Sequence, residues 1–426
     1  MIRFGLKEHG TDIKTELIAG MSTFLAMLYI VPVNASILST TGMPFDALVT
    51  ATALITIIAT LINAFWSNTP VAMSVGMGLN TFFAFGMVKG MGMSWQSALG
   101  VQVVSATLYV LISLTPLRSW IVRSIPLDIK RAVSASIGAF IAFIGFQEMH
   151  IIVKDSATLV TLGDLRSPQI ILGLFGMILG IFLLLKKVRA AFIISMISTA
   201  ALAWIFRIAP LPDRVVSMPA SLAPIFAKMD IPSVLTLSAL PVILTFLVTD
   251  IFDTLGTLTG LGLRAGFFRR EHSPELERSI QADAVGTFLS GLFGVTSTTP
   301  FVENAAGVEA GGRTGLTAVV VALLFLFPLF FLPFFKAIPS FAIYPVLILI
   351  GAMMFSELKG INYDDPAVLY STFFMILGMP LSYSITDGLL MGALVYVIVR
   401  AFQGRFLENR GMVFLATIGV VLFFIL

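Results

Sequence analysis

The sequence predicts an all-α polytopic membrane protein. Of its 426 residues, 58% are hydrophobic and only 12% are charged, whereas soluble domains carry about 25% charged residues. A soluble protein of this length would need polar surfaces that this composition cannot supply. Because a helix crosses the bilayer with about 20 apolar residues, the chain has room for a dozen or more spans and no sizeable soluble domain.

Long apolar segments, separated by charged residues, Pro or Gly, mark the expected spans. They number about 14 and lie near residues 13–36, 46–67, 70–88, 97–117, 131–149, 168–185, 190–209, 234–263, 279–296, 299–311, 314–335, 338–355, 366–380 and 383–400. A further apolar stretch, residues 412–426, is short for a span. It either lies at the membrane interface or crosses incompletely.

The basic residues predict the orientation, because Lys and Arg prefer cytoplasmic loops. With the N-terminus and the loop 264–278 inside, most of the 26 Lys and Arg residues fall on the cytoplasmic side. If the count were wrong by one span, the later clusters of Lys and Arg would fall outside. Their consistent position on the inner side therefore favours an even number of spans. Residues 1–10 lack the apolar core and cleavage site of a signal peptide. We therefore expect a multi-pass protein of the cell (inner) membrane with a cytoplasmic N-terminus.

Two of the expected spans are too polar and too rich in small residues for continuous helices. They are the third span, PVAMSVGMGLNTFFAFGMV at residues 70–88, and the tenth, TTPFVENAAGVEAGG at residues 298–312. If the chain is divided near Lys228, each is the third element of its half, and seven spans per half insert the second half upside down. Interrupted segments at matching positions of such a 7+7 inverted repeat indicate a transporter binding site near the bilayer midplane.

Polar side chains inside the spans are candidate site residues, because carboxylates are costly in lipid and usually face protein or water. The candidates are Asp250, Asp253, Asp283, Glu303, Asn304 and Asn80. Asp250 and Asp253 are three residues apart in span eight and hence share one helical face. The functional interpretation is one polar pocket whose carboxylates accept N–H donors from a planar solute and cycle a proton.

The structural alternative is that some of these residues only cap or tie helices. Asn80 could cap a half-helix that begins at Thr81, and Asp283 could bind a Thr hydroxyl of another span. Glu309 and Arg313 lie near the expected cytoplasmic edge, where an ion pair is favoured over a substrate contact. Four phenylalanines adjoin the polar candidates and are candidates for a stacking platform under an aromatic solute: Phe82, Phe83, Phe252 and Phe301.

Several function classes are disfavoured by the composition. The chain has no Cys, and its three histidines, His9, His150 and His272, lie far apart, so we expect no metal site and no cofactor. No nucleophile–base pair indicates an enzyme, and no basic run with interleaved aromatic residues indicates nucleic-acid binding. A channel would need a ring of pore residues that the sequence does not suggest. An anion transporter is the strongest rival, but the binding spans carry carboxylates instead of Arg or Lys.

Four motifs carry a resemblance to a known family. AMSVGMGLNTFFAF, LVTDIFDTLGTL, QADAVG and FVENAAGVEAGGRTGLTAVV resemble the AzgA-type adenine/guanine/hypoxanthine permeases, a branch of the nucleobase/ascorbate transporter superfamily. The resemblance runs along essentially the whole chain. One departure is TSTTPFVENAAG, where Pro300 and Phe301 occupy positions that are small, hydroxylic or aromatic in relatives.

The resemblance implies proton-driven purine uptake by a core domain that moves against a gate domain. It assigns residues 1–117 and 229–335 to the core, and residues 118–228 and 336–426 to the gate. Asn80 resembles the span-three polar residue of the family, and analogy implies a homodimer. The family's span-eight carboxylates and its span-ten substrate-binding carboxylate correspond to Asp253, Asp250 and Glu303.

A purine presents ring N–H donors and N or O acceptors on a flat face. Carboxylates of spans eight and ten could accept from the N–H edge, while Asn80 and the half-helix N-termini donate to ring acceptors. Desolvation penalises a charged carboxylate, so one of Asp250, Asp253 or Glu303 could carry the proton. Asp253 and Asp250 are the expected carriers, with Asp283 or Glu303 next. The alternative substrates on the same fold are a sulfate-like or bicarbonate-like anion, or uracil or xanthine.

Overall fold

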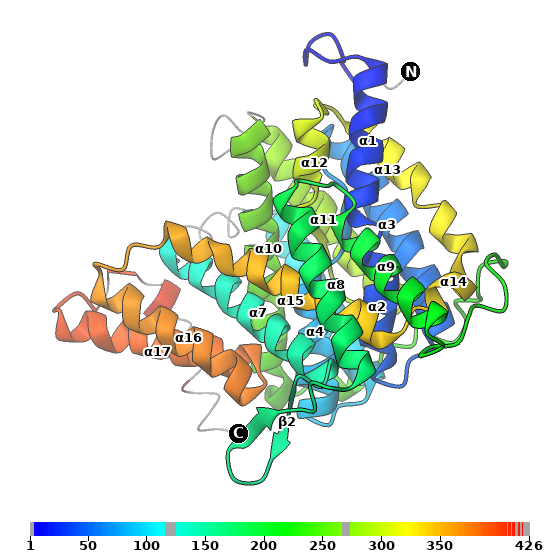
Figure 1. Cartoon of the computed structure of the whole chain (residues 1–426). Coiled ribbons are helices and arrows are strands. Elements are labelled where there is room, and N and C mark those ends of the chain that lie inside the picture. Colours follow the sequence, from blue (N-terminus) through cyan, green and yellow to red (C-terminus); the bar gives the residue numbers. More distant parts are fainter. Residues whose placement is uncertain are drawn as a thin grey trace.

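The computed structural model describes residues 4–115, 125–265 and 273–406, and then 408, 409, 411–413, 416, 417 and 420. The loop residues 266–272, with His272, and much of the stretch 412–426 lie outside the described residues. The described part is a helical bundle with two small two-stranded sheets (Figure 1). Eight of its helical segments are long and apolar enough to cross a membrane. The multi-pass helical class is therefore confirmed, while the exact 14 spans and the inverted repeat stay predictions.

The described elements of the first half are α1 (Ile13–Met27), α2 (Ile30–Ser39), α3 (Phe45–Ser67), β1 (Met73–Val75), α4 (Met77–Thr81), the π-helix η1 (Phe82–Gly90), α5 (Trp95–Ser113), α7 (Leu127–Glu148), β2 (Ile152–Asp155), β3 (Leu159–Leu162), α8 (Pro168–Leu185) and α9 (Ala191–Ile205). A long connection without regular structure, residues 206–231, leads to the second half.

The second half begins with two short 3-10 helices and ends with a pair of antiparallel helices. Its described elements are η2 (Pro232–Val234), η3 (Leu237–Ala239), α10 (Leu240–Ala265), α11 (Pro274–Leu292), β4 (Thr298–Pro300), α12 (Asn304–Glu309), α13 (Gly315–Leu324), η4 (Phe327–Phe330), α14 (Leu332–Lys336), α15 (Ser340–Phe355), η5 (Ser356–Gly360), α16 (Pro366–Ser382) and α17 (Ile385–Phe402).

Local sequence signals explain where many helices start. Side-chain oxygens accept a hydrogen bond from a first-turn N–H at seven of the described starts, namely Asp12, Ser94, Ser167, Ser273, Thr314, Asp365 and Ser384. Such caps satisfy N–H groups that have no partner inside the helix. Pro168, Pro274 and Pro366 follow directly in three of these helices, where the missing N–H of proline costs nothing.

Pro32 breaks the first span into α1 and α2. Proline has no N–H, so it cannot donate to the Leu28 carbonyl four residues earlier. That carbonyl accepts a long hydrogen bond from the Val31 N–H instead, at 3.4 Å. Leu28 and Tyr29 form a turn between the two helices. The break places Tyr29 in the interior, where its side chain is 1% exposed.

The described helices pack in two groups. One contains α1, α2, α3, α5, α10, α11, α12 and α13, and the other contains α7, α8, α9, α15, α16 and α17. In Figure 1, α7, α16 and α17 extend to the left, whereas α1, α3 and α13 lie on the right. Small residues permit close crossings within the second group. A Cβ on Gly138 of α7 would lie 2.6 Å from the Gly351 carbonyl oxygen of α15.

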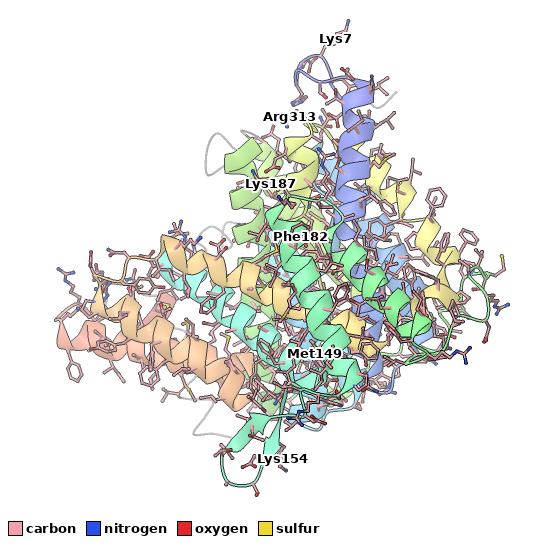
Figure 2. The ribbon with its side chains drawn as sticks, viewed as in Figure 1. Lys7, Met149, Lys154, Phe182, Lys187 and Arg313 are labelled. Atoms are coloured by element: carbon pink, nitrogen blue, oxygen red, sulfur yellow. The ribbon has the colours of Figure 1, made fainter. Side chains whose placement is uncertain are left out.

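Basic residues separate along the bundle as the parity argument requires. Lys7, Lys187 and Arg313, all expected to be cytoplasmic, lie toward one end of the molecule, and Lys154, expected outside, lies at the other (Figure 2). The assignment of one end to the cytoplasm stays a prediction.

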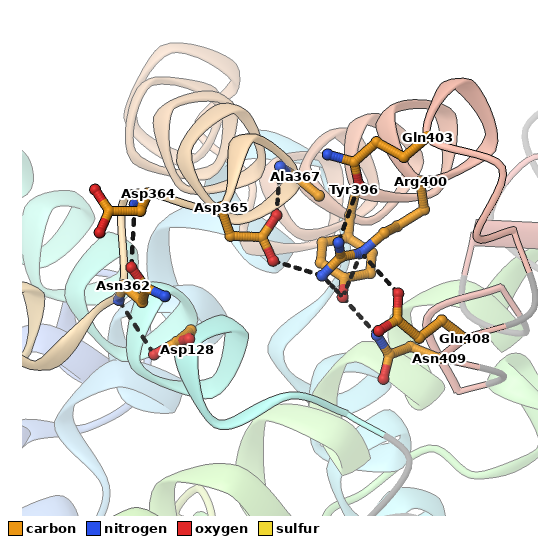
Figure 3. Close-up of polar contacts among 10 residues, drawn as sticks. All are labelled: Asp128, Asn362, Asp364, Asp365, Ala367, Tyr396, Arg400, Gln403, Glu408 and Asn409. Atoms are coloured by element: carbon orange, nitrogen blue, oxygen red, sulfur yellow. Dashed lines mark hydrogen bonds and ion pairs between the residues drawn. The ribbon is translucent and has the colours of Figure 1, made fainter.

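A buried arginine ties the C-terminal residues to α16 and α17 (Figure 3). Arg400 is 8% exposed, and its Nη2 donates to Asp365 Oδ2 at 2.5 Å and to the Tyr396 hydroxyl at 3.2 Å. Glu408 Oε2 lies 3.7 Å from Arg400 Nε, and Asn409 Nδ2 donates to the Tyr396 hydroxyl at 2.5 Å. Residues 408 and 409 are therefore held against the end of α17.

Candidate functional site

The centre of the candidate site is a pair of antiparallel strands, β1 and β4, buried among helices of the first group. The register pairs Met73 with Pro300, Ser74 with Thr299 and Val75 with Thr298. All six residues are buried. Because water is scarce at this depth, each strand must satisfy the peptide groups of the other. Both segments that we expected to be discontinuous thus contain a strand followed by a short helix.

Gly76 connects β1 to α4, and its N–H donates to the Ser297 carbonyl at 2.9 Å. A Cβ on Gly76 would lie 3.0 Å from Thr299 Cγ2 and 3.8 Å from Asp253 Oδ2. The absence of a side chain therefore lets β4 and α10 approach the start of α4 closely. Neither α4 nor α12 has a side-chain cap hydrogen bond at its start.

Asp250 and Asp253 lie one turn apart on α10, as predicted. Asp250 is 1% exposed, and its Oδ1 has no hydrogen-bond partner. Asp253 is half-buried beside Gly76. The hydroxyl of Thr249, next to Asp250, is also buried without a partner. Since buried polar atoms in folded proteins are nearly always hydrogen-bonded, these atoms are candidates for contact with a solute or water.

Asn80 is fully buried in α4, and neither its Nδ2 nor its Oδ1 has a hydrogen-bond partner. The cap that we considered for it is wrong, because α4 begins at Met77 and Asn80 lies in its last turn. Three hydroxyls in and before β4 are likewise buried, namely Thr296, Ser297 and Thr299. Those of Ser297 and Thr299 lie next to the carboxyl groups of Asp250 and Asp253. Asn80 thus offers one donor group and one acceptor that the protein leaves unused.

Glu303 immediately precedes α12 and is half-buried. The hydroxyl of Tyr29 donates to its Oε1 at 2.6 Å. Tyr29 comes from the break in the first span and is a site residue that the sequence reasoning missed. Its position three residues before Pro32 is the only local signal that could have suggested it.

Asn304 and Asp283 are engaged by other parts of the protein. Asn304 Nδ2 donates to the carbonyls of Ala72 and Phe301, and its Oδ1 accepts from the Ala72 N–H at 2.8 Å. This amide therefore ties α12 to the segment before β1. Asp283 accepts hydroxyl hydrogens from Tyr109, Thr254 and Thr298, so the structural alternative of a tie to a Thr hydroxyl is present. Their roles in binding and proton coupling stay predictions.

The four candidate phenylalanines are buried, at 0% for Phe82 and Phe83, 7% for Phe252 and 4% for Phe301. The rings of Phe82 and Phe246 lie 6.3 Å apart between centroids, within the range of aromatic contacts. Packing therefore accounts for Phe82. The stacking role of Phe301 and the others stays a prediction.

Glu16 is a second residue that the sequence reasoning missed. It is fully buried, and its carboxylate accepts from the N–H of Arg313 at 2.9 Å and from the N–H of Thr317 at 3.0 Å. It thereby holds the start of α13 against α1, where the positive end of the helix dipole favours an anion. Arg313 Nη1 donates to the carbonyl of Val308 at 2.7 Å.

A pocket of about 360 Å³ opens beside α12. It is lined by Leu261, Ala305, Val308, Glu309 and Arg313. Among the described residues, no group of three or more His, Asp or Glu is placed to hold a metal ion.

Comparison with known proteins identifies the family. A family model described as "Permease family" matches residues 14–406. The chain belongs to this permease family. The resemblance to AzgA-type purine permeases is thereby confirmed, and the family consists of transporters, not enzymes.

Relatives of this permease match along nearly its full length. A putative permease of Methanocaldococcus jannaschii is 41% identical over 99% of this chain and 97% of its own. The guanine/hypoxanthine permease PbuO of Bacillus subtilis is 37% identical over 99% of each chain. The adenine permease AdeQ of Escherichia coli is 36% identical over 94% of this chain and 90% of its own.

Solved structures of two transporters share the fold of this permease. The transmembrane domain of the cyanobacterial bicarbonate transporter BicA matches with a TM-score of 0.63 at 12% identity, covering 96% of this chain and 97% of its own. SLC26A9 matches with a TM-score of 0.61 at 14% identity, covering 92% of this chain and 66% of its own. At these identities the likeness establishes the fold alone.

Proposed function

We propose that this permease transports purine nucleobases, with adenine, guanine and hypoxanthine as candidate substrates, by proton-coupled alternating access. The relatives PbuO and AdeQ, which are named as purine permeases, support the substrate class. The observation that carries the proposal is the buried, unpartnered amide of Asn80 in α4, the helix that follows β1. The half-buried carboxylates of Asp253, beside Gly76, and of Glu303, just before α12, belong to elements next to the same strand pair. A flat base with N–H donors and ring acceptors complements both groups.

An anionic substrate is less well supported, although BicA transports bicarbonate on the same fold. The charged side chains that we place in the site are all acidic: Asp250, Asp253, Asp283 and Glu303. A sulfate or bicarbonate ion would be repelled by any of these groups that is ionised. A neutral base meets no such penalty, and uracil or xanthine remain the alternatives within that class.

Proton coupling is assigned to Asp250 and Asp253. They lie one turn apart in a span, and one oxygen of Asp250 has no partner. Two neighbouring carboxylates in a site of low dielectric are not both ionised, so one of them can carry a proton. A proton gradient could then concentrate an uncharged base.

Alternating access is assigned to movement between the two groups of packed helices. The first group corresponds to the core domain expected from the sequence, and the second group to the gate domain. The strand pair β1–β4 joins both halves of the core, which supports movement of the core as one unit.

Counterflow in proteoliposomes tests the substrate class. Vesicles loaded with unlabelled hypoxanthine should accumulate labelled hypoxanthine, and in parallel assays labelled adenine, uracil and sulfate should be compared. We expect exchange of at least one purine and none of sulfate. Glu303→Gln should weaken purine binding strongly, because an amide presents a donor where the carboxylate accepts, which costs about 1–3 kcal/mol. Exchange of sulfate but not of purines would overturn the proposal.

A further inference from the structure

We infer that Tyr29 is a positioning residue for Glu303, and that it links the orientation of this carboxylate to helix α9. The inference rests on the proposed function, since it concerns how the site binds its solute. Two contacts of the Tyr29 side chain support it. The hydroxyl donates a hydrogen bond, and the ring makes an edge-to-face contact with another ring.

The hydroxyl contact fixes one oxygen of Glu303. Tyr29 is 1% exposed, and its hydroxyl donates to Glu303 Oε1 at 2.6 Å. A hydrogen bond from a neutral hydroxyl to a carboxylate is strongest when the carboxylate is ionised. The bond therefore depends on the protonation of Glu303 and holds its carboxylate in one rotamer.

The ring contact connects Tyr29 to the second group of helices. Its ring meets that of Phe192 in α9 edge to face, with centroids 4.8 Å apart and an interplanar angle of 64°. Phe192 is 4% exposed. A second contact between the same parts is a hydrogen bond from Arg189, just before α9, to Ser22 of α1, at 2.5 Å. Helix α9 itself packs on α8 and α15.

These contacts make Tyr29 sensitive to any shift of α9 relative to α1. Its backbone lies in the turn created by Pro32, where the helix lacks a regular hydrogen bond and can adjust. If α9 moves, the Tyr29 ring loses its contact with Phe192, and the hydrogen bond from the Tyr29 hydroxyl to Glu303 changes direction. The affinity of the site for a base is thus coupled to the relative position of the two helix groups.

Two single substitutions separate the two contacts. Tyr29→Phe removes the hydroxyl and keeps the ring, and Phe192→Leu removes the ring contact and keeps the hydroxyl. Tyr370→Phe, on α16 at 51% exposure, is the matched control for loss of a tyrosine hydroxyl. We expect Tyr29→Phe to weaken purine binding about tenfold and to change the pH dependence of binding. Phe192→Leu should weaken purine binding less than Tyr29→Phe does, because the hydroxyl is kept, and it should lower the turnover rate.

The double variant Tyr29→Phe/Glu303→Gln tests whether Tyr29 acts through Glu303. We expect Tyr29→Phe to add little to the defect of Glu303→Gln, because the group it positions is already gone. Unchanged affinity and pH profile in Tyr29→Phe, or fully additive defects in the double variant, would overturn the positioning role. An unchanged turnover rate in Phe192→Leu would overturn the link to α9.

Infrared spectroscopy provides a readout that needs no substrate. The carboxyl bands of Glu303 can be assigned by their disappearance in Glu303→Gln. We expect these bands to shift in Tyr29→Phe and not in Tyr370→Phe. Bands that stay in place would contradict the inference even if purine transport is confirmed, and shifted bands would support it even if the substrate proves to be another solute.

Discussion

Thr254 of α10 donates its hydroxyl hydrogen to Asp283 Oδ2 of α11 at 2.5 Å. Tyr109 of α5 donates to the same oxygen at 3.3 Å, and Thr298 of β4 donates to Oδ1, also at 3.3 Å. One carboxylate thus receives hydroxyls from three elements around the strand pair. This arrangement is typical of a tie between packed helices in a membrane.

We expect Asp283→Ala to destabilise the protein, because the buried hydroxyls of Tyr109 and Thr254 lose their acceptor, each worth about 1–3 kcal/mol when left unpaired. The Thr298 hydroxyl keeps the backbone carbonyl of residue 283 as a partner. Asp283→Asn should remain folded, since it keeps a carbonyl oxygen at the site. Thr254→Val removes only one hydroxyl and should cost less than Asp283→Ala. Thermal unfolding in detergent measures all three variants. A wild-type melting temperature for Asp283→Ala would argue against the tie.

Asn80 and Asn304 are both fully buried, but only the side-chain amide of Asn304 has hydrogen-bond partners. We expect Asn304→Ala to lower the free energy of unfolding by about 1–3 kcal/mol for the backbone groups left unpaired. Asn80→Ala should leave the substrate-free protein as stable as the wild type, or more stable, while purine binding is lost. Melting temperatures with and without substrate test the pair. Equal destabilisation of both variants would show that the Asn80 amide has a structural partner.

Neutralising the α10 carboxylates should uncouple transport. We expect Asp253→Asn, and to a lesser degree Asp250→Asn, to abolish accumulation driven by an imposed pH gradient while counterflow at equal pH continues. The reason is that Glu303 and Asn80 remain to contact the base when the proton carrier is gone. Asp46→Asn, at the exposed pair with Lys336, is the control. Accumulation that still follows the gradient in both variants would assign the proton to another group.

The orientation can be tested by single cysteines, because the chain has none of its own. Ala157 lies at the exposed turn between β2 and β3, and Glu8 lies exposed near the N-terminus. We expect a membrane-impermeant maleimide to label Ala157→Cys in intact cells and to label Glu8→Cys only after lysis. The reverse pattern would invert the topology.

Arg400 should stabilise the end of the second helix group. We expect Arg400→Met to lower the free energy of unfolding by about 1–3 kcal/mol, because Asp365 and Tyr396 lose a donor in a largely buried position. Lys336→Met breaks a pair with Asp46 whose side chains are 60% and 42% exposed. Exposed pairs contribute less than about 1 kcal/mol, so this control should melt near the wild-type temperature. An equal fall in melting temperature for Arg400→Met and Lys336→Met would show that burial of Arg400 does not increase its contribution to stability.

The sequence predicted the features that depend on local composition. Carboxylates inside apolar windows are rare, and they marked the acidic residues of α10. Together with the density of Gly and other small residues, they also marked the interrupted segments. The contact of Tyr29 with Glu303 was not predictable, because the two residues are 274 positions apart and a tyrosine in a span is usually explained by packing.

The sequence also could not predict that the Asn304 amide has hydrogen-bond partners and the Asn80 amide has none. Both are asparagines in the short helices that follow β1 and β4, and nothing in either motif says which amide finds a partner. That depends on where β1 lies against β4, since the partners of Asn304 include the backbone of Ala72. Which amide has a partner is therefore determined by the register of β1 against β4 in the folded chain.

The strand pair also dictates an order of events during synthesis. Ala72 and Asn304, which flank the pair, are 232 residues apart, so β1 emerges from the ribosome long before β4 has been translated. Peptide groups without partners cost several kcal/mol each in lipid. The nascent first half therefore cannot release β1 into the bilayer alone, and this segment must wait beside protein or water. Completion of the binding site is a late step of biogenesis, and a chain that stops before residue 298 has no stable place for β1.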